Sequence, residues 1–362
     1  MHRVGVVGTI DGFQRRHPVI GFPLGVIYKF FDDQGNYLAA ILTYYAFVAI
    51  FPLMLLGTSI LGFVLGAKPE WQEEILDSAL AQFPIIGDQL GRPEGLRGSA
   101  AGVAFGTLAA LYGALGLAQS LQNAMHVAWS VPRNARPNPF YSRLKSLILL
   151  VTAGAALLGI SVLSTVASTT TTFFEQGERW LLSLVTVLVV GVALTALFRF
   201  AATGQHSFRR AAPGGFSLSV MWQLLQLGGA LYVAEVLVGT TAMTKTFGLV
   251  LGLVGFLFIG AVMAVLAVEI NVVLARRLYP RALLTPFTDS VTLTAADRRA
   301  YASYARMQRH KGFERVSVSW EAEDEAEQED EPEPDPVTEP ERDPEPRPEP
   351  GRAADRAPDP AP

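Results

Sequence analysis

Long uncharged runs separated by short charged connections are the main pattern along this chain. Six gaps between successive charged residues contain 19 to 35 residues each, beginning with the gap between Asp33 and Lys68. A helix needs about 20 residues to cross the hydrocarbon core of a bilayer. A helix of a water-soluble protein would instead keep a polar face, with charges recurring every three or four positions. The pattern therefore predicts an all-α, polytopic membrane helix bundle with six transmembrane helices.

These gaps divide the chain into four regions. Residues 1–36 form an N-terminal segment, residues 37–276 the six-helix transmembrane domain, residues 277–320 a juxtamembrane segment and residues 321–362 a tail. The predicted spans cover residues 37–65, 99–129, 146–170, 180–198, 214–237 and 248–274. Each span is long enough for one crossing of the bilayer.

The basic residues of the connecting segments predict the orientation. Segments on the N-terminal side of the membrane contain 14 Lys and Arg residues, and those on the other side contain five. Basic residues are retained on the cytoplasmic face of a membrane. We therefore expect a multi-pass protein of the inner or plasma membrane with its N- and C-termini in the cytoplasm.

The composition separates the tail from the rest of the chain. Charged residues make up 17% of the sequence, below the roughly 25% of soluble proteins. Residues 321–362 alone contain 17 Asp and Glu, four Arg and 11 Pro. Such a segment cannot bury enough apolar surface to offset the entropy of ordering, so we expect a disordered acidic, Pro-rich tail. The absence of cysteine excludes disulfides and thiolate chemistry.

A short amphipathic stretch precedes the first span. Residues 25–33 place Val26, Ile27, Phe30 and Phe31 on one side and charged residues on another. This arrangement favours an interfacial helix on the inner leaflet. The alternative is a simple continuation of the first span.

The first span contains a proline and two tyrosines. Pro52 lies in mid-span, where proline removes a backbone hydrogen bond and bends a helix. Tyr44 and Tyr45 precede it by about two turns. These residues predict either a bent helix that lines a cavity or a static kink accommodated by packing.

Four polar residues of the second span share one helix face. Gln119, Gln122, Asn123 and His126 follow the spacing i, i+3, i+4, i+7. Gln223 and Gln226 of the fifth span offer a second polar wall. One hypothesis is a polar cavity open to the cytoplasm; the alternative is interhelical hydrogen bonding that only holds helices together.

One acidic residue of the last span falls near its cytoplasmic end. Glu269 is expected to pair with an arginine of a neighbouring inner loop, or else to form a polar site at the mouth of a cavity. Asn271 points about 200° away from Glu269 around the helix, so the two side chains are expected to serve different neighbours.

Several arginines cluster in the inner loops. They are candidates for binding anionic lipid head groups, and the alternative is that they only fix the topology. These arginines are Arg133, Arg136, Arg143, Arg209 and Arg210.

Three stretches together resemble a known family. They are AAILTYYAFVAIFPLMLL (Ala39–Leu56), ALGLAQSLQNAMHVAWSVPRNARPNP (Ala114–Pro139) and KTFGLVLGLVGFLFIGAVMAVLAVEINVVLARRLYPR (Lys245–Arg281). The chain is similar to the BrkB/YihY family of six-span bacterial inner-membrane proteins over residues 20–285. Many members of that family carry Asn where His126 stands and Tyr-Gly where this chain has Phe247-Gly248. The resemblance implies a six-helix membrane fold, while members have been labelled virulence factors or, formerly, ribonuclease BN.

The residues argue against catalysis. The five histidines stand at positions 2, 17, 126, 206 and 310, none within four residues of another, so they predict no metal site. No P-loop motif is present, and the sequence contains no plausible combination of a catalytic nucleophile and a general base. We expect a non-enzymatic protein without a cofactor and without nucleic acid as a partner.

The expected function is envelope-related transport or lipid handling through a polar intramembrane cavity. The alternative is a non-transporting scaffold that organises envelope proteins through its cytoplasmic tail. The expected partners are the lipid bilayer, anionic lipids and, through small-residue helix contacts, a second copy of the chain.

Overall fold

The computed structural model describes residues 6–65, 100–170, 179–203, 207–232, 234, 242–287 and 291–320. Side chains are described in all of these ranges except for residues 6 and 7, 51–65, 100–107, 110, 155–170, 179–183, 232 and 242–246. The chain divides into two units, Met1–Ser317 and Val318–Pro362. All the helices described below belong to the first unit.

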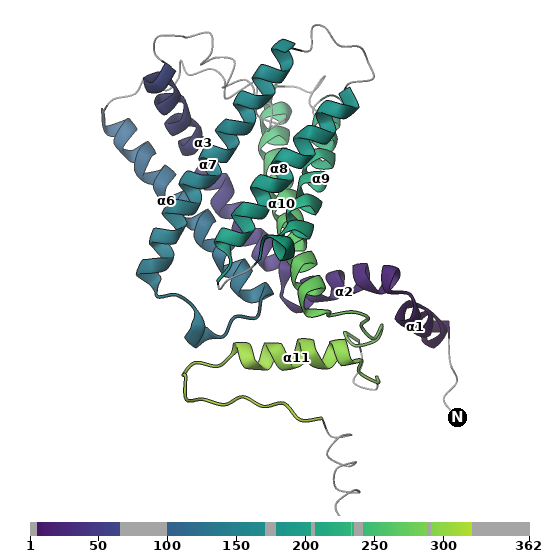
Figure 1. The fold of residues 1–362 in the computed structure, drawn as a ribbon. Coiled ribbons are helices and arrows are strands. Elements are labelled where there is room, and N and C mark those ends of the chain that lie inside the picture. Colours follow the sequence, from purple (N-terminus) through teal and green to yellow (C-terminus); the bar gives the residue numbers. More distant parts are fainter. Residues whose placement is uncertain are drawn as a thin grey trace, which may run out of the picture. The chain divides into compact units, whose positions relative to one another are not determined.

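Six helices of 23 to 35 residues build the first unit (Figure 1). They are α3 (Gly35–Leu65), α6 (Ala100–Ala128), α7 (Pro139–Thr170), α8 (Arg179–Ala201), α9 (Phe208–Tyr232) and α10 (Ala242–Arg276). The described part of the chain contains helices and connections but no strand. The expectation of an all-α fold is confirmed.

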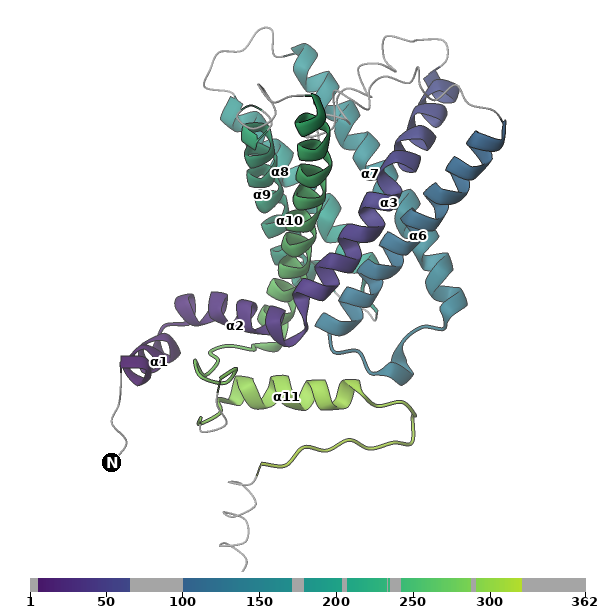
Figure 2. The same cartoon turned by 180° about the vertical axis from the view of Figure 1, so that it is seen from behind.

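Helix α10 occupies the centre of the bundle. It packs against α3 on one side and α9 on the other, and α3 and α9 pack in turn against α6 and α8 (Figure 2). Helix α7 joins α6 to α8. Buried apolar residues of α10, among them Val265, Val268 and Val272, form the core between these neighbours.

Glycines permit close contact where α9 crosses its two neighbours. A Cβ at Gly214 would overlap the carbonyl oxygen of Ala267 in α10, and a Cβ at Gly215 would overlap the Thr195 side chain in α8. The amide of Gly214 donates a hydrogen bond of 2.7 Å to Asn271 Oδ1. Small residues let backbones approach in this way in membrane bundles.

The outward faces of the bundle are apolar. Val151 of α7, Leu224 and Leu227 of α9 and Leu251 of α10 are each about 60% exposed. Among the described residues, Leu184–Ala201 and Phe247–Arg276 are long and apolar enough to cross a membrane, with mean hydropathies of 2.3 and 2.8, and Gly35–Ile50 is a shorter apolar helix. Large exposed apolar surfaces of this kind are typical of contact with lipid.

Three shorter helices lie at one end of the bundle (Figure 1). They are α1 (Val6–Arg16), α2 (Pro18–Asp32) and α11 (Ala295–Met307). A 3-10 turn, η2 (Arg133–Ala135), connects α6 to α7 near this end. This end is called the basal end below.

The observed helices begin and end at positions different from the predicted spans. Helix α7 begins seven residues earlier than predicted, at Pro139, and α9 six residues earlier, at Phe208. Residues 25–32 belong to α2, which already begins at Pro18, and Asp33 is its C-cap residue. The side chain of Pro52, part of the predicted fifth span (residues 233 and 235–237) and the tail 321–362 lie outside the description, so the predictions for them stay predictions.

Candidate functional site

Helix α2 lies across the basal end of α10 and the segment that follows it. Gly25 of α2 is buried against this segment, and a Cβ there would stand 3.0 Å from the carbonyl oxygen of Leu278. The opposite face is apolar and open: Ile20, Ile27 and Phe31 are 48%, 46% and 62% exposed. One face of α2 is thus fixed to the protein, while the other has the character of an interfacial helix.

A buried cluster of three charged residues joins α2 to α10. Lys29 Nζ pairs with the Asp33 carboxylate and lies 3.6 Å from Glu269 Oε2. The side chains of Lys29 and Glu269 are fully buried, and that of Asp33 is 1% exposed. The Lys29 ammonium also lies 5.1 Å from the ring centroid of Tyr304 in α11. We call Lys29, Asp33 and Glu269 the lysine cluster.

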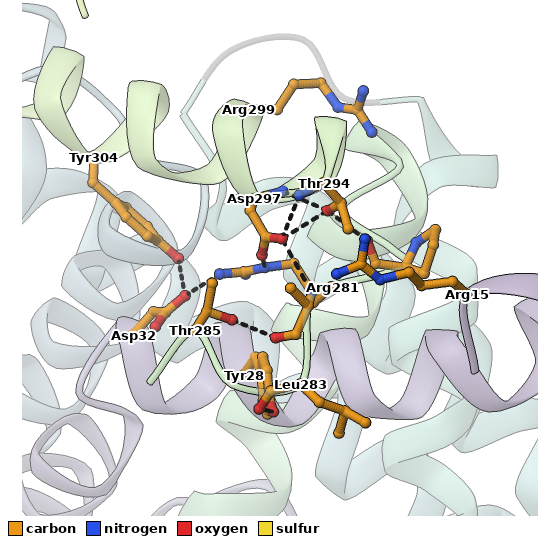
Figure 3. Close-up of polar contacts among 12 residues, drawn as sticks. Arg15, Tyr28, Asp32, Arg281, Leu283, Thr285, Thr294, Asp297, Arg299 and Tyr304 are labelled. Atoms are coloured by element: carbon orange, nitrogen blue, oxygen red, sulfur yellow. Dashed lines mark hydrogen bonds and ion pairs between the residues drawn. The ribbon is translucent and has the colours of Figure 1, made fainter. Parts of the chain in front are cut away.

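A second buried cluster surrounds Arg281 (Figure 3). Its guanidinium pairs with Asp297 at the start of α11 and, at 3.0 Å, with Asp32 at the end of α2. The rings of Tyr28 and Tyr301 lie 5.9 Å and 5.4 Å from the guanidinium carbon. We call Arg281, Asp32 and Asp297 the arginine cluster.

The cap of α11 completes the arginine cluster. Thr294 is the N-cap residue and forms a capping box with Asp297, in which each side chain accepts a hydrogen bond from the other's backbone N–H. Asp297 Oδ2 also accepts the backbone N–H of Ala282 at 3.0 Å. The carboxylate that pairs with Arg281 therefore also fixes where α11 begins.

Helix α1 also binds the segment that follows α10, through hydrogen bonds to the backbone of Arg281 and Leu283. Gln14 is buried and donates a hydrogen bond to the carbonyl oxygen of Arg281. Asp11 Oδ1 accepts the backbone N–H of Leu283 at 3.0 Å. Burial opposes ionisation of Asp11, but this backbone hydrogen bond and the contacts with Gln14 and Arg15 bring its pKa below the ordinary value.

Burial and neighbouring charges shift the titration of the basal groups. Burial alone would lower the pKa of Arg281, but Asp32 and Asp297 raise it above its ordinary value. Burial, together with Asp33 and Asp32, raises the pKa of Tyr304. Arg281 therefore stays a cation and Tyr304 a neutral hydrogen-bond donor at neutral pH.

The polar stripe of α6 faces α7. Gln122 is fully buried and donates to Ser146 Oγ at 2.7 Å and to the Ser142 carbonyl at 3.3 Å. Gln119 Nε2 donates to Ser142 Oγ at 2.9 Å. His126 Nε2 is hydrogen-bonded to Thr203 Oγ1 at 2.6 Å. Hydrogen bonds of this kind are what the alternative hypothesis, interhelical hydrogen bonding, predicts for the polar stripe.

The bundle contains an apolar cavity of about 280 Å³. Its walls come from all six long helices and include Leu42, Leu149, Leu197 and Trp222. A second pocket, of about 690 Å³, lies beyond it toward the basal end. That basal pocket is lined by residues of α7, α8 and the adjoining connections, including Tyr141, Lys145, Arg199 and Thr203.

The predicted cavity-lining residues are spread over several environments. None of the members whose side chains are described lines either of these two cavities. Gln122, His126 and Glu269 are buried, Tyr45, Asn123, Gln223 and Gln226 are partly buried, and Tyr44 and Gln119 are exposed. The structure brings Glu269 to the basal charges rather than to the stripe, and a polar cavity lined by this set stays a prediction.

The five predicted head-group arginines are not among the residues that line the basal pocket, although Arg136 and Arg209 adjoin lining residues in the chain. Arg133 donates to Gln308 Oε1 at 3.2 Å and Arg136 to the Val131 carbonyl at 3.3 Å. Arg143, Arg209 and Arg210 are exposed. The basic residues that line the pocket are Lys145 and Arg199, which the sequence had indicated only as determinants of topology.

Sequence reasoning missed the partner of Glu269. An inner-loop arginine was expected, whereas the nearest cation is Lys29 of α2. The expectation that Asn271 serves a different neighbour is confirmed, because Asn271 binds Gly214 of α9. The partners of Arg281 are distant in the chain and carried no sequence signal. The i, i+4 spacing of Lys29 and Asp33 and the capping box of Thr294 and Asp297 are local signals that could have been found.

Comparisons with known proteins agree with a membrane bundle. A UPF0761 membrane protein of Nitrosospira multiformis is 24% identical over 230 residues, which are 58% of this chain and 50% of that relative. The chain thus spans about half the length of this curated relative. No solved structure matches the chain. The model of the family described as Virulence factor BrkB matches residues 26–289, which include the second half of α2, all six long helices and Arg281. The chain therefore belongs to the BrkB family of membrane proteins.

Proposed function

We propose that this protein is a non-enzymatic, six-span protein of the cell membrane that binds anionic lipid. Both termini lie in the cytoplasm in this proposal, and the basal end faces the inner leaflet. The apolar cavity takes an acyl chain, and the basal pocket takes the anionic head group. The observation that carries the proposal is the succession of these two pockets along the same pair of helices.

The apolar cavity suits a hydrocarbon chain. Its lining consists of aliphatic, aromatic and glycine residues, and burying apolar surface is favourable without any directional contact. Ligand pockets have volumes of about 300–1,000 Å³, so a cavity of about 280 Å³ is at the small end of this range. It fits one acyl chain better than a whole lipid.

The basal pocket suits a negatively charged group. Lys145 and Arg199 supply two positive charges, and Tyr141 and Thr203 supply hydroxyl donors. Lys145 Nζ is held in place by hydrogen bonds to the carbonyls of Ala201 and Ala202, at 3.1 Å and 2.8 Å. A cation fixed in this way is ready to attract phosphate without first losing side-chain freedom.

The two pockets are adjacent along the helices that line them. On α7, Lys145 lines the basal pocket and Leu149, one turn later on the same face, lines the apolar cavity. On α8, Leu197 lines the apolar cavity and Arg199, two residues later, lines the basal pocket. An amphiphile therefore finds a charged site and an apolar site one helical turn apart.

Lipid binding by the purified full-length protein tests this proposal. We expect anionic lipid to be retained over zwitterionic lipid, and Arg199→Gln to reduce that preference about fivefold, since a basic residue near an anionic surface contributes about 1 kcal/mol. Ala153→Phe, which fills the apolar cavity, should weaken binding of both lipids.

The matched control is Arg306→Gln, which removes an exposed positive charge from α11, away from both pockets. It should leave the lipid preference unchanged. Equal retention of both lipids by the wild-type protein, or an equal effect of Arg199→Gln and Arg306→Gln, would contradict the proposal. The scaffold alternative depends on residues 321–362, outside the described residues, and stays a prediction.

A further inference from the structure

The Glu269 carboxyl is buried without a hydrogen-bond donor. Its side chain is fully buried in the middle of valine-rich core residues of α10, and in the described structure neither of its oxygens has a hydrogen-bond partner. The Lys29 ammonium lies 3.6 Å away, but it donates its hydrogen bond to Asp33. An ionised carboxylate in such a place costs several kcal/mol in lost solvation.

The arginine cluster provides a comparison, because its buried carboxylate, Asp297, has several hydrogen-bond donors. Asp297 accepts hydrogen bonds from Arg281, from the backbone N–H groups of Ala282 and Thr294, and from the Thr294 hydroxyl. Asp32 accepts from Arg281 and is 22% exposed. Both carboxylates thus have hydrogen-bond donors, whereas neither Glu269 oxygen has a donor or contact with solvent among the described residues.

The two carboxyls of the lysine cluster lie against the same ammonium, because Lys29 Nζ pairs with Asp33 and lies 3.6 Å from Glu269 Oε2. When both are ionised, neither can donate, because a carboxylate only accepts hydrogen bonds. A single proton leaves this buried site with one carboxylate beside one ammonium, so that the charges balance. Two carboxyls in this relation titrate as a pair.

We infer that the lysine cluster is a proton-binding site, in which Asp33 and Glu269 share one proton beside the Lys29 ammonium. Binding forms one O–H bond on a carboxyl oxygen, and release returns the proton to water. No oxidant, reductant or other ligand takes part. Because the site connects α2 to α10, the proton holds α2 against the end of the bundle.

Other charged groups face the site from the elements around it. The Lys29 ammonium lies over the Tyr304 ring of α11, and Asp32, which pairs with Arg281, accepts a hydrogen bond from the Tyr304 hydroxyl. Arg276 of α10 donates to the Trp129 carbonyl and interacts electrostatically with Asp33. Helices α3, α6 and α9 also pack on α10, and their described ionisable residues are Tyr37, Tyr44, Tyr45, Tyr112, His126, Arg209 and Arg210. None of these seven has a described contact with the lysine cluster, and His126 is bound to Thr203.

The shifted pKa of Asp33 determines the direction in which the stability of the fold changes with pH. Burial raises the pKa of Asp33, although Lys29 acts in the opposite direction. The folded protein therefore holds the shared proton more tightly than the unfolded chain, whose Asp titrates near pH 3.9. The stabilisation is complete below the unfolded pKa and is lost as pH rises through the folded pKa. The free energy of unfolding should therefore decrease as the pH rises above the folded pKa of Asp33.

Infrared spectroscopy of the full-length protein in detergent tests the inference. Ordinary carboxyls titrate near pH 4, so at neutral pH a carbonyl-stretch band of a protonated carboxyl reports a perturbed group. We expect this band in the wild-type protein and its loss in Glu269→Gln or Asp33→Asn. Glu269→Gln mimics the protonated form and should also flatten the dependence of thermal stability on pH.

Glu314→Gln is the matched control, because Glu314 is partly exposed and accepts the backbone N–H groups of His310 and Lys311. It should keep both the band and the pH dependence. The inference is overturned if the wild-type protein lacks the band at neutral pH, or if the band persists in both cluster variants. Should Glu269→Gln fail to fold, the wild-type spectrum and Asp33→Asn decide.

Discussion

At the scale of residues, the basal end is organised by charged side chains whose partners are far apart in sequence. Arg281 is fully buried and contacts Asp32, 249 positions earlier, and Asp297, 16 positions later. Removing one partner of a buried ion pair leaves an uncompensated charge, which costs more than the pair itself contributes. The arginine cluster should therefore be sensitive to loss of a single carboxylate.

We predict that Asp297→Asn lowers the free energy of unfolding by about 3–5 kcal/mol, the range for a broken buried pair. The amide cannot neutralise Arg281, whose Nη1 already has no hydrogen-bond partner among the described residues. Thermal unfolding in detergent measures the effect, with Glu314→Gln, at a partly exposed position, as the control for an acid-to-amide change. A loss no larger than that of the control would show that the cluster does not stabilise the fold.

The contact partners of individual polar residues could be predicted from the sequence only in part. The stripe spacing correctly indicated that Gln119, Gln122 and His126 face polar partners, because helical periodicity is local. The partner of Glu269 could not be found in this way, since it depends on α2 lying across the end of α10. In the sequence, Lys29 and Arg281 look like ordinary charged residues of the inner connections. Their burial depends on helices that are distant in the chain.

At the scale of elements, the crossing of α9 with α8 and α10 depends on two adjacent glycines. Gly214 faces Ala267 and Asn271 of α10, while Gly215 faces Thr195 of α8. Any side chain at these positions must push a neighbouring backbone or a buried side chain away. Backbones have little room to move in a packed interior.

We predict that Gly214→Ala destabilises the bundle by about 1–3 kcal/mol or more, the cost of overpacking a tight contact. Gly228→Ala in the same helix is the matched control, since a Cβ there meets nothing within 4 Å. Unfolding in detergent, followed by the loss of monodisperse protein, compares the two. Equal stability of both variants would mean that α9 does not approach α10 as closely as described.

The extents of the helices were predicted less well than their existence. Helices α7 and α9 begin before the predicted spans because Arg143, Lys145, Arg209 and Arg210 lie inside their first turns. Charge gaps mark where hydrocarbon contact is expected to begin, whereas a helix continues beyond it as long as its backbone is hydrogen-bonded. The edge of a charge gap is therefore not the end of a helix.

At the scale of the whole helical unit, the apolar cavity and the basal pocket follow one another toward the end where α2, α10 and α11 hold the charge clusters. The sequence could not predict this arrangement, because the lining of a cavity depends on which helices are neighbours. It predicted a polar cavity from the stripe, whereas the described cavity of the bundle is apolar. The proposal thus places the lipid head group and the proton site on the cytoplasmic side.

Cysteine accessibility tests this placement most directly, because the chain has no cysteine of its own. Single cysteines at Ser207 and Ser317, near the basal end and the C-terminal segment, should react with a membrane-impermeant maleimide only after spheroplasts are permeabilised. A cysteine at Ser78, between the first two predicted spans, should react in intact spheroplasts. Labelling of Ser207→Cys or Ser317→Cys in intact spheroplasts, or protection of Ser78→Cys there, would contradict a six-span bundle with its basal end in the cytoplasm.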